Sequence, residues 1–317
     1  MRKMSGWQKA GLIAGVGCFS VIGVVVIGLV IAAAWARSVV ADLGDTTPAR
    51  IERSIAVEPS AASPKIVKPD APVEPMQLTV DLEEGFFTIK PGPPGGQVQV
   101  QGMYAPGLYE LTETLDADAR RATIRFRSKA PQWARILAGM GDGDSNRPEL
   151  TVVIPRGAPM DLVLRLSMGE SRVDLGGLTL RDLDVDVSMG EHRIDFQTPV
   201  VEGLRRVRLN GSMGNVNVEN LGNARPQAIE GSGSMGNLIA DLGGAWDPGS
   251  QAQMSFSHSM GELTLRVPTS VRLETEVRDG DGERRSTGDT TQPDDPKAPV
   301  VKVRVSTSMG ETRVVRY

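Results

Sequence analysis

The tripeptide Ser-Met-Gly constrains the fold of this 317-residue chain more than any other feature of its sequence. It occurs six times, and each copy is followed by Glu or Asn. The six copies contribute the pairs Met168 and Gly169, Met189 and Gly190, Met213 and Gly214, Met235 and Gly236, Met260 and Gly261, and Met309 and Gly310. Successive glycines are separated by 21, 24, 22, 25 and 49 residues. Self-similarity at such a period is typical of a stacked repeat architecture.

Apolar residues alternate on both sides of the tripeptide, but with opposite parity. In the copy at Gly190 they lie at odd distances before the glycine and at even distances after it. They are Leu183, Val185, Val187 and Met189, followed by Ile194 and Phe196. Side chains in a strand alternate with a period of two, so the change predicts a sharp corner between two strands. Glycine suits such a corner because it adopts positive φ without penalty. The Met and Gly residues above are therefore our predicted structural corners, with the methionines on the apolar side.

The repeat predicts an all-β domain, a β-solenoid (β-helix-like) stack in which each rung covers the apolar faces of its neighbours. A degenerate copy surrounds Gly85, where Glu84 replaces the methionine. The 49-residue gap contains an alternating segment, 270–277, with no Ser-Met-Gly. We expect it to be a rung between the last two corners, whose own corner is replaced by a polar, mobile insertion at 278–299.

Four further segments near the start of the domain alternate in the same way and predict half-buried strands. They are residues 78–89, 97–104, 108–115 and 122–128. Residues 131–140 are compatible with one short helix or a capping segment, and a loop follows at 141–148.

An uncharged run at residues 10–36 is long enough for a helix that crosses a bilayer. Basic residues precede it, so residues 1–9 are expected in the cytoplasm and the rest outside the membrane. The alternative is a cleaved signal peptide, because Ala34-Trp35-Ala36 resembles a cleavage site. Cys18 is interpreted as a small apolar residue of the membrane helix rather than a lipidation site.

The segment that follows, 37–75, is rich in Pro, Ala and Ser and predicts an extended tether. It would connect the membrane helix to an extracytoplasmic domain at 76–317. The expected location is therefore a bacterial cell membrane, with a single span and the domain in the periplasm or outside the cell.

Composition excludes several functions. The net charge of −4 gives no reason to expect nucleic acid as a partner. A single cysteine rules out an internal disulfide and a zinc site built on cysteines. The chain has two histidines and no nucleophile elbow, phosphate-binding loop or metalloprotease motif. We therefore predict no catalytic residues, no metal site and no cofactor.

Three features allow a functional reading beside the structural one. The methionine column is interpreted as packing in the core, with Cu(I) binding through the thioethers as the alternative. A second column follows the glycines, and it predicts either a solvated edge or a strip that binds cations. It consists of Glu170, Glu191, Asn215, Asn237, Glu262 and Glu311. His192 and His258 fall at inward positions and suggest packed histidines, with a His–carboxylate site as the alternative.

Two acidic segments, 142–146 and 279–283, have part of the spacing of a calcium loop. The first has Arg147 where the EF-hand requires glycine, and it lacks the glutamate at position twelve. The second is a weaker match. Neither segment therefore predicts a calcium site.

The strand–SMGE–strand unit, the opening "LTVDLEEGFFTIKPG" and the endings "VDLGGL", "IDF" and "IADLGG" resemble the bacterial toast-rack domains over residues 76–317. They are also similar to the related "putative-adhesin" solenoids and to the extracytoplasmic part of LiaF-like proteins. The resemblance implies a membrane-associated β-solenoid linked to envelope-stress signalling or adhesion, with no enzymatic activity. A single span departs from the several spans of LiaF-like proteins.

The sequence thus predicts a membrane-anchored module that binds a protein or a cell-envelope glycan. One alternative is an enzyme that acts on cell-wall or surface polysaccharide from a β-helix scaffold. A second is a structural spacer that self-associates through its end rungs.

Overall fold

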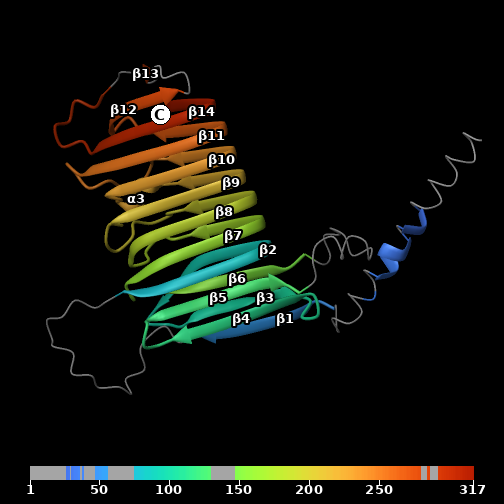
Figure 1. Ribbon diagram of the computed structural model, residues 1–317. Coiled ribbons are helices and arrows are strands. Elements are labelled where there is room, and N and C mark those ends of the chain that lie inside the picture. Colours follow the sequence, from blue (N-terminus) through green and yellow to red (C-terminus); the bar gives the residue numbers. More distant parts are fainter. Residues whose placement is uncertain are drawn as a thin grey trace, which may run out of the picture. The chain divides into compact units, whose positions relative to one another are not determined.

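The computed structural model describes residues 26–28, 30–35, 38, 47–55, 75–129, 147–279, 284–285 and 292–317. The chain divides into two compact units. The smaller unit comprises residues 1–48, 105–109 and 128–147, and the larger comprises the rest. In the described residues the strands form one 14-stranded sheet (Figure 1).

Strands account for nearly all the regular structure of the larger unit, so the prediction of an all-β domain is confirmed. The strands at the N-terminal end of the sheet are β1 (Ala49–Ile55), β2 (Met76–Pro94), β3 (Val98–Tyr104), β4 (Tyr109–Asp116), β5 (Arg121–Ser128) and β6 (Glu149–Arg156). The others are β7 (Met160–Asp174), β8 (Leu180–Asp195), β9 (Arg206–Glu219), β10 (Ala228–Asp241), β11 (Gln251–Val267), β12 (Arg272–Asp279), β13 (Arg284–Arg285) and β14 (Val300–Arg316). One helical turn, α3 (Leu221–Ala224), lies between β9 and β10.

The repeats stack in parallel and in register, from β2 through β7 to β11 and then β14 (Figure 1). Each motif glycine lies beside the next, as Gly169 beside Gly190 and Gly236 beside Gly261. The degenerate copy belongs to the same stack, because Glu84 pairs with Met168 and Gly85 with Gly169. Each rung contains one long bent strand rather than two separate strands joined at the predicted corner.

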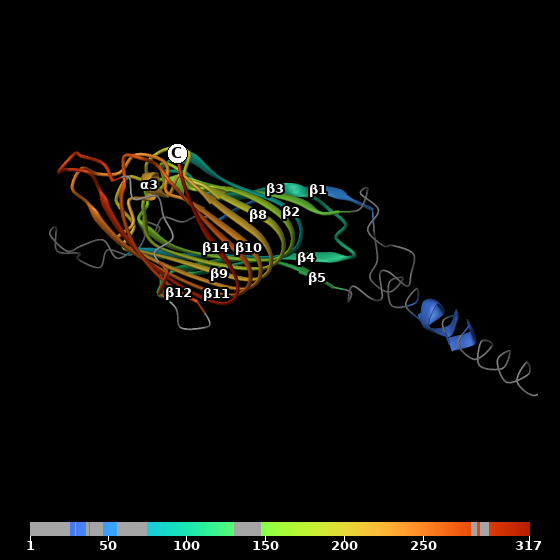
Figure 2. The same ribbon diagram turned by 90° about the horizontal axis from the view of Figure 1, so that it is seen from above.

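Each of these strands bends at its motif glycine, and Figure 2 shows the nested curves. We call the residues before the glycine the first arm and those after it the second arm. In β8 the buried apolar residues nearest the corner are Leu183, Val185 and Val187 in the first arm and Ile194 in the second arm. The two arms therefore enclose one apolar core, and the buried side changes parity at the glycine.

The expectation that the methionines pack in this core is wrong. The exposed fractions are 40% for Met189, 44% for Met213, 43% for Met235, 41% for Met260 and 67% for Met309. In β2, β7, β8, β11 and β14 the last buried side chain before the corner lies three residues before the glycine, whereas β9 and β10 have a glycine there. In β2 and in β7 to β11 the first buried side chain after the corner lies two residues beyond the glycine. Between these positions the inside of the bend is too narrow for a side chain, so the methionines lie on its outer side.

The order of the C-terminal strands also differs from the expected one. β14 pairs directly with β11, with Gly261 beside Gly310. β12, which contains most of the alternating segment without a corner, lies outside β14 and pairs with its first arm only. A strand without a corner can cover one arm, whereas β14 with its glycine matches the whole of β11. In the insertion, residues 280–283 and 286–291 lie outside the described residues. The side chain of Gln292 hydrogen-bonds both backbone groups of Leu273.

At the N-terminal end, two separate strands cover the two arms of β2. β5 pairs with the first arm and β6 with the second, both in parallel. β3 then pairs with β6, β1 with β3 and β4 with β5, and the first two of these pairings are antiparallel. β1 thus belongs to the sheet although it lies within the segment expected to be a tether. Antiparallel strands end the repeat and restrict addition of further rungs.

Of the expected membrane helix, residues 10–25 lie outside the described residues, and residues 30–35 are helical. Within the described part, no helix combines the length and the apolar character that spanning a bilayer requires. Most of residues 37–75 and all of 131–140 also lie outside the described residues.

Candidate functional site

The corner glycines contact one another and leave no room for a ligand. Gly169, Gly190, Gly214, Gly236 and Gly261 have φ between 113° and 129°. A Cβ built on Gly190 would lie 1.8 Å from the carbonyl oxygen of Gly169. The glycines therefore serve the backbone, and chemistry must come from the side chains around them.

The serine of each motif has a structural role that the sequence did not indicate. Ser188 donates from its Oγ to the carbonyl oxygen of Ser167 at 2.6 Å, and Ser234 does the same to Ser212. The outer column after the glycines behaves similarly in the middle rungs, where Asn237 donates to Asn215 across 3.2 Å. Both columns therefore tie neighbouring rungs together, and the asparagines separate the two groups of glutamates.

Neither column forms a metal site in the part of the chain that the structure describes. No group of three or more His, Cys, Asp or Glu side chains there could hold an ion. The acidic segment 142–146 lies outside the described residues, as do residues 280–283 of the second one. The exposed methionines remain available to solvent as a column of thioethers along the corner.

His192 is buried in the second arm of β8, with 3% of its surface exposed. Its Nε2 lies 3.2 Å from the carbonyl oxygen of Met189 and therefore carries the proton. Its Nδ1 accepts from the hydroxyl of Ser171 at 2.9 Å. Burial lowers the pKa of His192, so the ring is neutral at pH 7. The ring is a packed histidine with a hydroxyl partner.

This burial predicts sensitivity to acid. Because the folded-state pKa of His192 lies below the ordinary value near 6.5, the unfolded chain takes up a proton first as pH falls. The neutral His192 ring therefore makes its full contribution to the free energy of unfolding above the ordinary pKa, and this contribution is lost as the pH falls below it. The double variant Ser171→Ala/His192→Val resembles the β9 rung, which has Val216 at this position. We expect it to lose less stability than the parent between pH 7 and pH 5, measured by urea unfolding. An equal loss would contradict the assignment.

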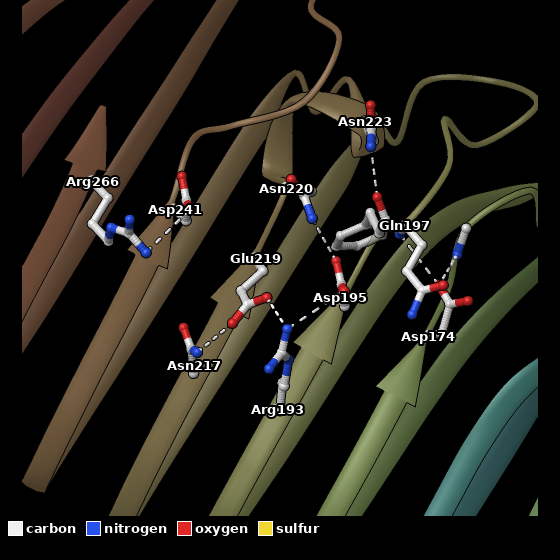
Figure 3. A network of polar contacts seen from close by, with 12 residues as sticks. Asp174, Arg193, Asp195, Gln197, Asn217, Glu219, Asn220, Asn223, Asp241 and Arg266 are labelled. Carbon is white, nitrogen blue, oxygen red and sulfur yellow. Dashed lines mark hydrogen bonds and ion pairs between the residues drawn. The ribbon is translucent and has the colours of Figure 1, made fainter. Parts of the chain in front are cut away.

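The ends of the second arms carry a network of carboxylates (Figure 3). Asp195 accepts from Asn220 at 2.7 Å, and Glu219 accepts from Asn217 at 2.6 Å and from Arg193. Asp174 accepts from the backbone N–H of Gly176 at 2.9 Å. These contacts fix the turns that leave the sheet. Because the acceptors are already used, this network stabilises the rungs rather than offering a binding site.

The outer face of the first arms has a different character. Asp186 of β8 lies 3.7 Å from Arg165 of β7 and accepts from Asn210 of β9 at 2.8 Å. Asn210 in turn accepts from the hydroxyl of Ser232 of β10 at 2.7 Å. This row of polar groups crosses four rungs, with one residue from each. Beside it, Arg208 donates to Glu230 at 3.0 Å.

These two rows line a shallow hollow of about 520 Å³, which we call the polar hollow. Its polar side chains are Asp184, Asp186, Arg208, Asn210, Glu230, Ser232 and Ser255. A second hollow of about 640 Å³ shares Asp186, Asn210 and Ser232 with it and continues along the serine column. The combined surface offers carboxylates, hydroxyls, an amide and guanidinium groups at the spacing of the rungs.

Asp184 is the residue of the polar hollow that is least satisfied by the protein. Its Oδ1 is buried and has no hydrogen-bond partner among the described residues. Burial raises the pKa of Asp184, and the neighbouring charge of Asp186 raises it further. A buried acceptor without a donor is costly, so a new hydrogen bond to the Asp184 carboxyl would be favourable, although Oδ1 itself is not open to the hollow.

The site residues predicted from the sequence do not line the polar hollow. The predicted Met and Gly residues form the corner, whereas the hollow lies four and six residues before the glycines. Those are outward positions of the same repeat, and their alternation with the apolar residues was the signal available. The sequence alone could not show that Oδ1 of Asp184 has no hydrogen-bond donor, because this depends on the side-chain contacts of the folded protein.

The fold and this surface define an all-β repeat protein with a polar outer face. Residues 73–219 match the family described as the N-terminal domain of toast_rack, DUF2154. Over this region the chain is similar to the toast-rack family, which supports the resemblance drawn from the sequence. The matched region includes β8 and β9 and hence Asp184, Asp186, Arg208 and Asn210.

Three crystal structures align with most of the chain. A "putative cell adhesion protein" from Clostridium sporogenes ATCC 15579 shares 11% identity with a TM-score of 0.39, covering 86% of this chain and 100% of that one. A "putative adhesin" from Bacteroides fragilis NCTC 9343 shares 12% with a TM-score of 0.37, covering 84% and 97%. A "putative adhesin" from Parabacteroides merdae ATCC 43184 shares 8% with a TM-score of 0.28, covering 86% and 98%. No curated protein matches the sequence.

Proposed function

We propose that this protein is a non-enzymatic, extracytoplasmic binding module of the cell envelope that holds a glycan chain in its polar hollow. The observation that carries the proposal is that carboxylates, hydroxyls, an amide and a guanidinium group from neighbouring rungs line the polar hollow. A polyhydroxylated ligand supplies both donors and acceptors to such a surface. The rungs repeat along the sheet, which suits an extended ligand better than a compact one.

The proposed location follows from the sequence of the N-terminal region. An uncharged run at residues 10–36 with basic residues before it suits a retained membrane anchor. The module would then act at the outer surface of the membrane, either in adhesion or in sensing damage to the envelope. Mass spectrometry of the protein extracted from membranes tests the anchor. A mature chain that begins after Ala36 would indicate a cleaved signal peptide instead.

Binding to envelope glycans tests the proposed ligand. We expect the full-length protein in detergent to bind fragments of cell-wall glycan or surface polysaccharide on an array. Asp184→Asn together with Arg208→Ala should weaken that binding by roughly 10-fold to 100-fold, as expected for lost hydrogen bonds to charged groups.

Glu191→Gln is the matched control, because Glu191 is an exposed carboxylate outside the polar hollow. It should bind as the parent does. Binding that is equal in all three proteins would contradict the proposed site, and binding to no glycan would contradict the ligand. Release of new reducing ends during incubation would instead favour the enzyme.

A second candidate function is self-association through the C-terminal end of the stack. β12 covers the first arm of β14, and no strand among the described residues covers its second arm. Thr312 and Val314 of the second arm are half-exposed, whereas Leu263 and Leu265 beside them in β11 are fully buried. Light scattering across a concentration series tests this candidate. A monomer at all concentrations would exclude it.

A further inference from the structure

A cavity lies at the bend of β9 and β10, and its lining includes Asn210 and Ser232 of the polar hollow as well as core residues. The position three residues before the motif glycine faces the core, and where it carries a side chain that side chain is buried. Along the stack this column reads Leu166, Val187, Gly211, Gly233, His258 and Thr307. Two consecutive rungs therefore place no side chain there. The resulting space is about 20 Å³ and is lined mainly by apolar groups, with His258 at one side.

The imidazole of His258 fills the gap at Gly233 but not the gap at Gly211. A Cβ on Gly233 would lie only 2.2 Å from Nδ1 of His258. A Cβ on Gly211 would meet nothing closer than 3.6 Å, the distance to Val216. The cavity thus begins beside Nδ1 and extends towards the second glycine.

The hydrogen bonds of His258 determine what Nδ1 can do. Its Nε2 lies 3.1 Å from the carbonyl oxygen of Gly236, and since a carbonyl only accepts, Nε2 carries the proton. In the neutral ring Nδ1 is then an acceptor. The side chain is 4% exposed, and no described residue donates to Nδ1. An unmatched acceptor at this depth is strongly unfavourable.

His192 has the same arrangement as His258, except that its Nδ1 has a hydrogen-bond donor. It has the same tautomer, with Nε2 bonded to a backbone carbonyl, and its Nδ1 accepts from the hydroxyl of Ser171. At His258 the neighbouring rung provides Gly233 in place of a hydroxyl. The missing donor therefore has to come from a molecule in the cavity.

We infer that the cavity at Gly211 and Gly233 is a binding site for a buried water molecule that donates to Nδ1 of His258. Its volume exceeds the roughly 10–15 Å³ that one water requires. A second acceptor is within reach, because the carbonyl oxygen of Ser232 lies 3.9 Å from the position of a Gly211 Cβ. The water would donate to both and replace the side chain that these two rungs lack.

Two substitutions at Gly211 separate a hydrogen-bonded water from a dry cavity. Gly211 does not have the positive φ of the corner glycines, so a side chain fits its backbone. Gly211→Ser brings a hydroxyl that takes over the donor role, whereas Gly211→Ala displaces the water and leaves Nδ1 unmatched. We expect the melting temperature of the serine variant to exceed that of the alanine variant by at least about 2 °C.

The same comparison with His258→Leu in the background provides the control, because the acceptor is then absent and the serine advantage should disappear. Nitrogen NMR gives a second readout that does not depend on stability. The Nδ1 resonance of His258 in the parent should match that of His192, which accepts a known hydrogen bond. Alanine as stabilising as serine, together with an Nδ1 resonance typical of a free acceptor, would overturn the inference.

Discussion

Replacing Gly190 with valine should lower the free energy of unfolding by at least about 3 kcal/mol, which is among the largest effects expected of a single substitution. Gly190 has a φ of 118°, a region that residues with a branched Cβ hardly adopt. Its added Cβ would also lie 1.8 Å from the carbonyl oxygen of Gly169, a backbone atom that cannot move alone. The strain would spread to both neighbouring rungs.

Chemical denaturation followed by circular dichroism measures this loss. Glu191→Ala is the matched control, since it changes the next residue on the exposed side of the same corner and should shift stability by no more than about 0.5 kcal/mol. Equal unfolding midpoints for the two variants would contradict the role assigned to the glycine. An intermediate result for Gly190→Ala would separate the strain from the added bulk of valine.

Phe126→Ala should cost about 3–5 kcal/mol, because the side chain is fully buried at the N-terminal end of the stack. Its ring lies edge-on to the rings of Tyr104 and Phe87, with distances between ring centroids of 5.1 Å and 6.2 Å. The three rings connect β5 to β3 and β2. Loss of the Phe126 ring would uncover β2, the first bent strand of the stack. A repeat stack depends on strands that cap its ends, as β5 does here.

The exposed neighbour Arg125 provides a comparison, since Arg125→Ala alters the same strand on its outer side and should change stability far less. Hydrogen exchange adds spatial detail to the melting curve. In Phe126→Ala the amides of β2 and β7 should lose protection before those of β10. Uniform loss of protection along the stack would show that the rungs unfold as one unit and that the cap has no local role.

The repeat itself could be predicted because two independent signals coincide at each corner. Alternation fixes which side of each arm is buried, and the change of parity at Gly190 locates the bend. The methionines were misplaced because alternation continues through Met189 as if the strand were straight. Only the bend shows that the inside of the corner cannot hold a side chain.

The position of β12 could not be predicted for a different reason. Alternating residues at 270–277 show that the segment is a half-buried strand, but not which strand it pairs with. Both β11 and β14 present suitable apolar faces. The order of these strands depends on the corner glycine, since β14 has one and covers both arms of β11, whereas β12 has none and covers only one arm of β14.

The polar hollow could be predicted from the sequence only as a general location on the outer face. Which oxygen of Asp184 has no hydrogen-bond partner depends on the contacts of its neighbours.

The placement of β14 between β11 and β12 sets a constraint on how the chain can be assembled. Rungs β7 to β11 can each dock on a neighbour that has already been made, in the order of synthesis. β12 is made before the strand that it pairs with in parallel, so it must wait for β14 before it can join the sheet. Tyr317, which follows β14, then donates to Asp241 at 2.6 Å. Docking of β12 is therefore coupled to synthesis of β14, and a variant that lacks β14 would expose β11 and leave β12 without its parallel partner.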